Sequence, residues 1–340
     1  MEKDNIIEVK NLHVDIAMTE GTLTPVRGVN FEIKRGETLG LVGESGSGKS
    51  LTCKAILGIN DKKCKASGQI LFNSKESGEM DLLSLNPKGK EIRNVRGKQI
   101  SMIFQEPMVA FSPMYTIGNQ INECTLLHIT KDKKKAKEIS MEVMRKVGIA
   151  NVEKRYNQYP HEFSGGMLQR ALIAMALVCN PDMLIADEPT TALDVTIQAQ
   201  ILELMMELKD KLGMAIIMIT HDLGIVASMC EKIAVMYAGR IVEYGTTDEI
   251  FYEPKHEYTK GLLRSIPKLD AKEHEKLIPI EGTPIDLLNP PKGCPFAPRC
   301  SNCMKICLRE MPPVTTFGDT HYTQCWMNQK EQMEGGKASE

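Results

Sequence analysis

One stretch of the sequence has the residues and the spacing needed to hold a phosphate chain. Residues 43–50 read Gly-Glu-Ser-Gly-Ser-Gly-Lys-Ser and match G-x-x-x-x-G-K-[ST] at every fixed position. The apolar run 39–42 precedes them, and residues 51–57 follow without glycine or proline, as expected for a strand–loop–helix unit. Such glycines let backbone N–H groups surround an anion, and the positive end of the helix dipole faces the same anion.

This phosphate loop, residues 43–50, is therefore predicted to bind a nucleotide. Lys49 is expected to reach the β- and γ-phosphates, and the Ser50 hydroxyl to bind Mg²⁺. The predicted contacts come from the loop and the next helical residue: Gly43, Ser45, Gly46, Ser47, Gly48, Lys49, Ser50 and Leu51.

A pair of carboxylates follows another apolar run. Residues 183–186 are apolar and end in Asp187-Glu188. Carboxylate oxygens are ligands that Mg²⁺ prefers, and a glutamate one residue further can take a proton from an attacking water. We predict that Asp187 contacts Mg²⁺ and that Glu188 is the general base. Alone, such a pair is more often a surface feature, and the phosphate loop is what favours the catalytic interpretation.

A second glycine turn, Ser164-Gly165-Gly166, opens a predicted helix over residues 167–179. A serine and backbone N–H groups at a helix N-terminus form an anion site. An ordinary serine N-cap has the same sequence, so the turn is informative only beside the other motifs.

Strands that alternate with helices must position these residues. Antiparallel strands are predicted within residues 6–34 and a hairpin around Ala238-Gly239, whereas 73–98 is predicted to be irregular. Further strands are predicted at 39–42, 67–72, 100–104, 183–186 and 214–220. A mainly parallel sheet binds ligands beyond the C-terminal ends of its strands. The polar residues that follow such ends are Lys49, Ser50, Gln105, Asp187, Glu188 and His221.

The composition is that of a soluble globular protein. The 340 residues are 42% hydrophobic and 25% charged, with a net charge of −2, which offers no basic surface for nucleic acid. No apolar run approaches the ~20 residues that cross a bilayer, and the N-terminus has no signal-peptide pattern. We expect a cytosolic chain whose membrane association comes through partners.

The order of phosphate loop, Gln105, Ser-Gly-Gly, Asp-Glu, Thr191-Ala-Leu-Asp194 and His221 resembles an ATP-binding cassette (ABC) transporter ATPase subunit. The resemblance covers residues 6–250. It implies an α/β fold with an ABC-type P-loop ATPase core, an antiparallel β subdomain and a helical subdomain at about 108–180. It also implies a nucleotide-binding domain over residues 1–250, followed by a Cys-rich C-terminal extension over 251–340.

The resemblance assigns roles to further residues. Gln105 would coordinate Mg²⁺ and sense the membrane partner, Asp194 would lie at a dimer interface, and His221 would contact the γ-phosphate. Because the family dimerises head to tail, the turn at 164–166 would cap ATP held by the phosphate loop of the partner.

Five of the ten cysteines lie between Cys294 and Cys325. A zinc site using the Cys300/Cys303 pair, an iron–sulfur cluster and free thiols are the alternatives. The stretch 293–300, Gly-Cys-Pro-Phe-Ala-Pro-Arg-Cys, is similar to the C-terminal extension of dipeptide/oligopeptide transporter ATPases. That similarity implies a 4Fe–4S cluster on Cys294, Cys300, Cys307 and Cys325, with zinc as the alternative.

The resemblance thus implies the ATP-hydrolysing subunit of a di- or oligopeptide importer, peripheral at the cytoplasmic face of the cell membrane. Its expected partners are a second ABC ATPase subunit in a heterodimer, two transmembrane permease subunits and, indirectly, an extracytoplasmic solute-binding protein. The alternatives are an importer of another solute such as nickel, a non-transport cassette protein acting on DNA or ribosomes, and a redox-sensing regulator. No nucleic-acid partner is expected, and intact Lys49, Glu188 and His221 argue against a vestigial ATPase.

Overall fold

The computed structural model describes residues 4–190, 193–265 and 279–329. The chain forms two compact units. Unit 1 consists of Met1–Glu8, Glu32–Thr38 and Leu71–Ile219, and unit 2 of Val9–Phe31, Leu39–Ile70 and Thr220–Glu340. Each unit is described by itself below.

The core of unit 1 is a parallel sheet of three buried strands, β6 (Ile100–Ile103), β7 (Met183–Asp187) and β8 (Ala215–Ile219). Every residue of these strands is buried. Parallel strands that are covered on both faces have continuous apolar sequences, which explains why these runs do not alternate. The predicted strands at 100–104, 183–186 and 214–220 are confirmed.

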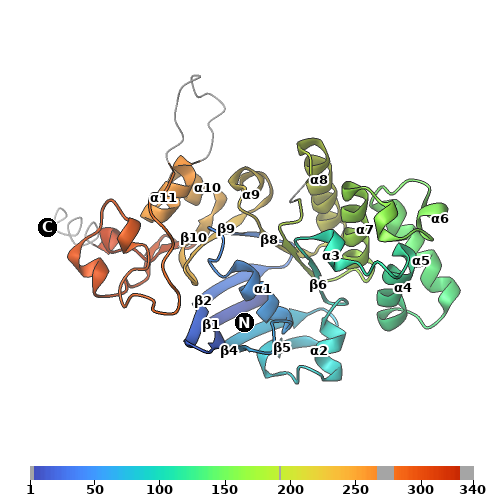
Figure 1. Ribbon diagram of the computed structural model, residues 1–340, viewed down its shortest axis with the longest axis horizontal. Coiled ribbons are helices and arrows are strands. Elements are labelled where there is room, and N and C mark those ends of the chain that lie inside the picture. Colours follow the sequence, from blue (N-terminus) through green and yellow to red (C-terminus); the bar gives the residue numbers. More distant parts are fainter. Residues whose placement is uncertain (1–3, 191–192, 266–278, 330–340) are drawn as a thin grey trace. The chain divides into compact units, whose positions relative to one another are not determined.

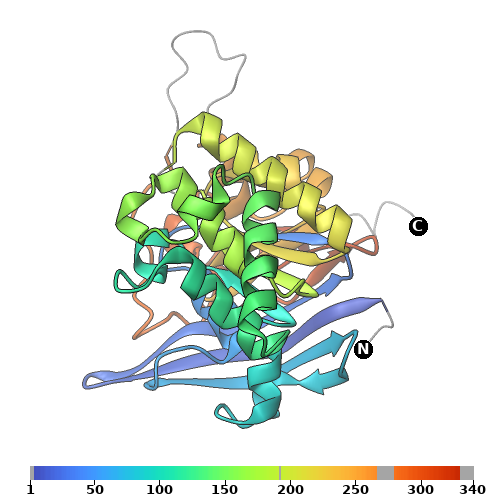
Figure 2. The same ribbon diagram turned by 90° about the vertical axis from the view of Figure 1, so that its right-hand side faces the viewer.

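Helices make up most of the remainder of unit 1, and Figures 1 and 2 show α4–α7 gathered together in green. In α5 the buried Ala136, Ser140 and Met144 recur every four residues, so one face of a charged helix is buried. The main helices of this unit are α3 (Pro107–Ala110), α4 (Ile117–His128), α5 (Lys133–Lys146), α6 (Val152–Arg155), α7 (Gly165–Leu177) and α8 (Val195–Leu212). The helical stretch predicted from Met108 to about 160 is confirmed.

The prediction of an irregular segment over 73–98 is wrong. The end of β4 (Cys64–Ser74) pairs antiparallel with β5 (Gly78–Asp81), and the 3-10 turn η1 (Leu82–Ser84) and helix α2 (Lys90–Val95) follow. Only Leu82, Ile92 and Val95 anchor η1 and α2 in the core. Elements this short contain too few apolar residues to show a period.

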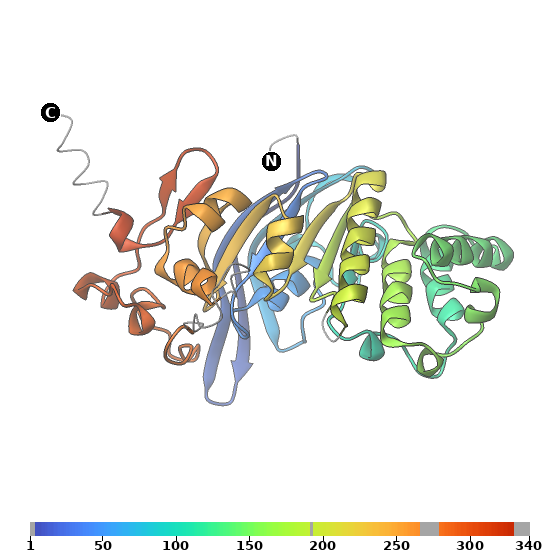
Figure 3. The ribbon, with the colours of Figure 1, turned by 90° about the horizontal axis from the view of Figure 1, so that it is seen from above.

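Unit 2 contains a mixed sheet and a hairpin. Strand β3 (Thr38–Val42) runs parallel to β9 (Lys232–Tyr237), and β9 pairs antiparallel with β10 (Arg240–Thr246). The β9–β10 turn uses Ala238 at φ 46° and Gly239 at φ 81°, which confirms the predicted hairpin. Figure 3 shows the blue hairpin of β1 (Asn5–Met18) and β2 (Gly21–Lys34).

Helices α1 (Lys49–Leu57), α9 (Leu223–Met229), α10 (Thr247–Tyr252) and α11 (Glu257–Arg264) also belong to unit 2. The described C-terminal segment, residues 279–329, extends the mixed sheet. It contains the turns η3 (Ala297–Arg299) and η4 (Lys305–Leu308) and strands β11 (Thr315–Phe317) and β12 (His321–Thr323). Strand β12 pairs with β10, so this segment is built onto the strands that precede it. Among the residues described, no helix is long and apolar enough to cross a membrane.

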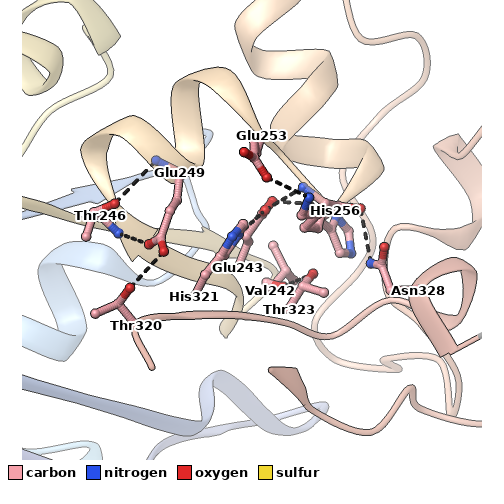
Figure 4. A network of polar contacts seen from close by, with 11 residues as sticks. Val242, Glu243, Thr246, Glu249, Glu253, His256, Thr320, His321, Thr323 and Asn328 are labelled. Carbon is pink, nitrogen blue, oxygen red and sulfur yellow. Dashed lines mark hydrogen bonds and ion pairs between the residues drawn. The ribbon is translucent and has the colours of Figure 1, made fainter. Parts of the chain in front are cut away.

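A buried carboxylate fastens the C-terminal segment to β10 (Figure 4). Glu243 is fully buried, and its oxygens accept the backbone N–H groups of Lys255 at 2.6 Å and of His256 at 2.9 Å. The Nε2 atom of His321, on β12, lies 2.8 Å from the same carboxylate. Three donors from two separate stretches of chain therefore converge on one side chain.

We expect Glu243→Ala to lower the free energy of unfolding by about 3 kcal/mol, because breaking a buried pair leaves its other members without acceptors. Denaturant unfolding followed by circular dichroism measures the change. The matched control is Glu253→Ala. It removes the ion pair between Lys255 and Glu253, and the Glu253 side chain is 71% exposed. The control is expected to stay within about 0.5 kcal/mol of wild type. Equal losses in both variants would contradict the anchoring role of Glu243.

Candidate functional site

The phosphate loop has the conformation that its glycines predict. Gly43, Gly46 and Gly48 have φ values of 147°, 78° and 100°, a region that L side chains rarely adopt. At two of them space is also closed, because a Cβ on Gly43 would overlap the Met236 carbonyl oxygen and one on Gly48 the Pro25 carbonyl oxygen. Both backbone torsion and packing therefore require glycine at these positions.

Lys49, the first residue of α1, is held over this loop. Its side-chain nitrogen donates to the carbonyl oxygens of Gly43 at 2.7 Å and Glu44 at 2.9 Å, and it lies 3.4 Å from the Ser47 hydroxyl. Lys49 and Ser47 are buried, whereas Ser45 and Gly46 are exposed at the tip of the loop. Ser50 and Leu51, half-buried, begin the helix beside them. An ammonium group thus stands at the helix N-terminus that the predicted anion would face.

The carboxylate pair in unit 1 lies at the end of β7, as the sequence predicts. Asp187 is 4% exposed and is the last residue of the strand. Glu188 has φ 49°, and its N–H donates to the carbonyl oxygen of Ile219 at 2.9 Å. A non-glycine residue in this left-handed conformation is held by its surroundings, which is a common feature of functional sites.

Gln105, which follows β6, meets Glu188 directly. Its Nε2 donates to the Glu188 Oε2 at 2.8 Å. Residues 83 positions apart in sequence are therefore brought together inside unit 1. The amide fixes the orientation of the carboxylate. A carboxylate held in this way is a group that can accept a proton from a water molecule.

The turn at 164–166 begins α7. The Ser164 hydroxyl accepts the N–H of Met167 at 3.4 Å, so the side chain caps the helix. A Cβ on Gly165 would lie 3.9 Å from its nearest neighbour, Leu193 Cδ2, whereas on Gly166 it would come within 2.9 Å of Ile197 Cγ2. Close packing therefore disfavours a side chain at 166, whereas at 165 a Cβ would make an ordinary van der Waals contact.

The two remaining predicted residues stand at helix starts. Asp194 caps α8 by accepting the N–H of Ile197 at 2.9 Å. Thr191 and Ala192, also part of that predicted motif, lie outside the described residues. His221 is exposed and lies two residues after the end of β8, beside Asp222, which caps α9. His221 belongs to unit 2 with the phosphate loop, and Asp194 to unit 1 with Gln105, Asp187 and Glu188.

The prediction of a 4Fe–4S cluster on Cys294, Cys300, Cys307 and Cys325, with zinc as its alternative, is wrong. Within residues 4–190, 193–265 and 279–329, no group of three or more His, Cys, Asp or Glu side chains could hold a metal ion. Cys294 and Cys307 are buried, and Cys300 and Cys325 are half-buried. These side chains are free thiols, the third of the alternatives that the spacing allowed.

Two residues that contact the phosphate loop were not predicted from the sequence. The Arg299 guanidinium forms two hydrogen bonds with the Glu44 carboxylate, and the Tyr258 hydroxyl accepts the Glu44 N–H at 2.8 Å. Arg299 lies between Cys294 and Cys300, and it was recognised from the sequence only as part of the motif at 293–300. No local pattern connects it to a residue 255 positions earlier.

Known proteins similar to this chain were identified by sequence. The family model described as "ABC transporter" matches residues 26–191, and that described as "Oligopeptide/dipeptide transporter, C-terminal region" matches 242–307. The dipeptide transport ATP-binding protein DppD of Bacillus subtilis is 51% identical over 329 residues, which is 96% of this chain and 95% of the relative. The oligopeptide transport ATP-binding protein OppD of the same organism is 52% identical over 324 residues, covering 95% of this chain and 88% of the relative.

Solved structures show the same fold. The dimeric bacterial ABC transporter cassette MJ0796 superposes with a TM-score of 0.61 at 25% identity, covering 71% of this chain and 98% of that chain. The structure of cbiO1 from Clostridium perfringens, part of the complex cbiONQ, gives a TM-score of 0.60 at 29% identity, covering 74% and 92%.

Proposed function

This chain belongs to the ABC transporter ATPases, and on that premise we propose that it is the ATP-hydrolysing subunit of an importer for di- or oligopeptides. The observation that carries the proposal is the likeness to a dipeptide transport ATP-binding protein, 51% identical over 96% of this chain. The match of residues 242–307 to a C-terminal region described for oligopeptide and dipeptide transporters supports the peptide class over nickel.

We infer that the phosphate loop binds the triphosphate of ATP. Its residues, from Gly43 to Ser50, and Leu51 would supply backbone N–H groups, and Lys49 would turn from the carbonyl oxygens of Gly43 and Glu44 to the β- and γ-phosphates. Ser50, Gln105 and Asp187 offer the hydroxyl, amide and carboxylate oxygens that suit Mg²⁺. When bound, Mg²⁺ supplies charge neutralisation for the phosphate oxygens.

Hydrolysis then depends on two side chains. Glu188, oriented by Gln105, takes a proton from the attacking water, and His221 stabilises the charge that develops on the γ-phosphate. Ser164 and Gly165 of the capped turn are exposed, and the turn has no lysine of its own, which fits a role on the nucleotide of a partner subunit. Asp194 would lie at that dimer interface.

We propose a head-to-tail dimer with a second ABC ATPase subunit, in a heterodimer. The solved cassette MJ0796, which is dimeric, supports the dimer. In this proposal the nucleotide-binding domain spans residues 1–250, with a helical subdomain at about 108–180, and residues 251–340 form the C-terminal extension. The chain would sit at the cytoplasmic face of the membrane through two permease subunits, with a solute-binding protein as an indirect partner.

An exposed apolar patch after Gln105 is the proposed contact with the permeases. Its large side chains are 60–78% exposed although all four are apolar or aromatic: Met108, Val109, Met114 and Tyr115. Exposed apolar patches of this kind mark docking surfaces. Because the patch begins three residues after Gln105, movement of a bound permease could reach the amide that orients Glu188.

Co-purification of the natively expressed protein tests the proposed function. We expect two hydrophobic permeases and a second ATPase subunit, whereas DNA or ribosomes in their place would contradict it. Val109→Glu, which places a charge on the patch, is expected to lose the permeases. The control Val314→Glu adds the same charge to a valine that is 53% exposed in the C-terminal segment. Equal recovery of permeases by both variants would show that the patch is not the contact.

A further inference from the structure

One arginine of the C-terminal segment, Arg299, forms an ion pair with the phosphate loop. Arg299 Nη1 lies 2.6 Å from Glu44 Oε2, and Arg299 Nη2 lies 2.9 Å from Glu44 Oε1. Two parallel hydrogen bonds between a guanidinium and a carboxylate are strong and fix the relative orientation of both groups. The Arg299 side chain is 4% exposed and that of Glu44 is 27% exposed, so water screens this pair less than it screens a surface ion pair.

Arg299 is itself held rigidly. Besides the two bonds to Glu44, its Nε donates to the Glu281 carbonyl at 2.9 Å, Nη2 to the Ile280 carbonyl at 3.2 Å, and Nη1 to the Tyr237 hydroxyl at 3.3 Å. All five N–H donors of the guanidinium therefore have acceptors. Its central carbon also lies 5.9 Å from the Tyr237 ring centre and 6.0 Å from that of Phe296.

A second group holds the backbone of the same glutamate. The hydroxyl of Tyr258, which is fully buried, accepts the Glu44 N–H, and its ring packs against Tyr237 and Phe296 at centre distances of 4.6 and 5.4 Å. Burial raises the pKa of Tyr258, so the hydroxyl stays neutral. On the other side of the same residue, the Glu44 carbonyl accepts Lys49 Nζ. Glu44 thus connects this aromatic cluster to the lysine of the phosphate loop.

The charge of Glu44 makes this arrangement necessary. A carboxylate in a loop that binds a triphosphate repels its ligand unless its charge is neutralised. We propose that Arg299 is a positioning residue of the nucleotide site, which acts through Glu44 to neutralise this carboxylate and to fix the first turn of the phosphate loop. The inference rests on the proposed ATP site, and it makes the C-terminal segment part of the ATP-binding apparatus.

The test measures the Kd for MgATP with a fluorescent ATP analogue, and kcat and KM by phosphate release, on the full chain. For Arg299→Met we expect a Kd and a KM raised about tenfold, with kcat at saturating ATP within about twofold of wild type. Adding Glu44→Gln to Arg299→Met removes the unpaired charge and is expected to recover most of the affinity. A purely structural defect would not be rescued by removing a second native side chain.

The controls separate the possible failures. His321→Gln disturbs the other buried pair of the C-terminal segment, which does not touch the loop, and should leave the Kd unchanged. Absence of MgATP binding by wild type would overturn the proposed function, not the role of Arg299. If wild type binds, an Arg299→Met chain that is folded by circular dichroism and binds within about twofold overturns the inference. Should that variant not fold, Arg299→Gln removes the charge but keeps a polar side chain, and an unchanged Kd for it overturns the inference equally.

Discussion

Replacing Glu188 by glutamine is expected to lower the rate of ATP hydrolysis by about 10³-fold and to change the Kd for MgATP by no more than about twofold. Glutamine has the size of glutamate and keeps an oxygen that can accept the 2.8 Å bond from Gln105 Nε2. The left-handed backbone at Glu188, φ 49°, is also unchanged by the substitution. The substitution removes the negative charge and, with it, the ability to take a proton from water.

Steady-state phosphate release and equilibrium binding of a fluorescent ATP analogue measure the two quantities. The matched control is Glu106→Gln, in which an exposed carboxylate next to Gln105 loses its charge. The control should hydrolyse ATP at nearly the rate of wild type. Retained turnover in Glu188→Gln would show that another group is the base, and a large rise in Kd would show that Glu188 acts in binding.

Local geometry that depends on neighbours in sequence could be predicted, and contacts made across the fold could not. The phosphate loop, the pair Asp187-Glu188 and the turn at 164–166 each combine a strand or helix end with its flanking residues, so a short window contains the whole signal. The contact between Gln105 and Glu188 was expected only as a consequence of neighbouring strand ends. Its hydrogen bond depends on the register of β6 against β7, in which Ile103 pairs with Ala186.

Two failures at the candidate site have physical causes. Cysteine spacing gives the distances along the chain between thiols but neither the direction nor the burial of each side chain, and burial differs from Cys294, which is buried, to Cys303, which is exposed. The Glu44–Arg299 fork joins residues whose surroundings in sequence are a glycine loop and a proline turn. Neither stretch of sequence has a periodicity or a motif that indicates which residue it contacts. The packing of Tyr237, Tyr258 and Phe296 brings Glu44 and Arg299 together.

A second large loss of turnover is expected at the turn at 164–166. Position 165 suits the test because it accepts a side chain without steric cost. We expect Gly165→Asp to lower turnover by about 10²-fold, since a carboxylate at the start of α7 opposes the anion that this turn is proposed to contact. The protein should remain folded. The nearest heavy atom to a new Cβ is 3.9 Å away, and an aspartate in the first turn stabilises a helix through its dipole.

The control Gly165→Ala adds the same Cβ without the charge and should keep most of the activity. Comparison of the two variants isolates electrostatics from backbone effects, because both replace the same glycine. If the turn acts on the nucleotide of a partner, the Kd of the isolated chain for MgATP stays within about twofold of wild type in both variants. A weaker Kd in Gly165→Asp alone would place the anion in the same chain, and equal loss of turnover in both would show that the glycine backbone, not charge, is what the site needs.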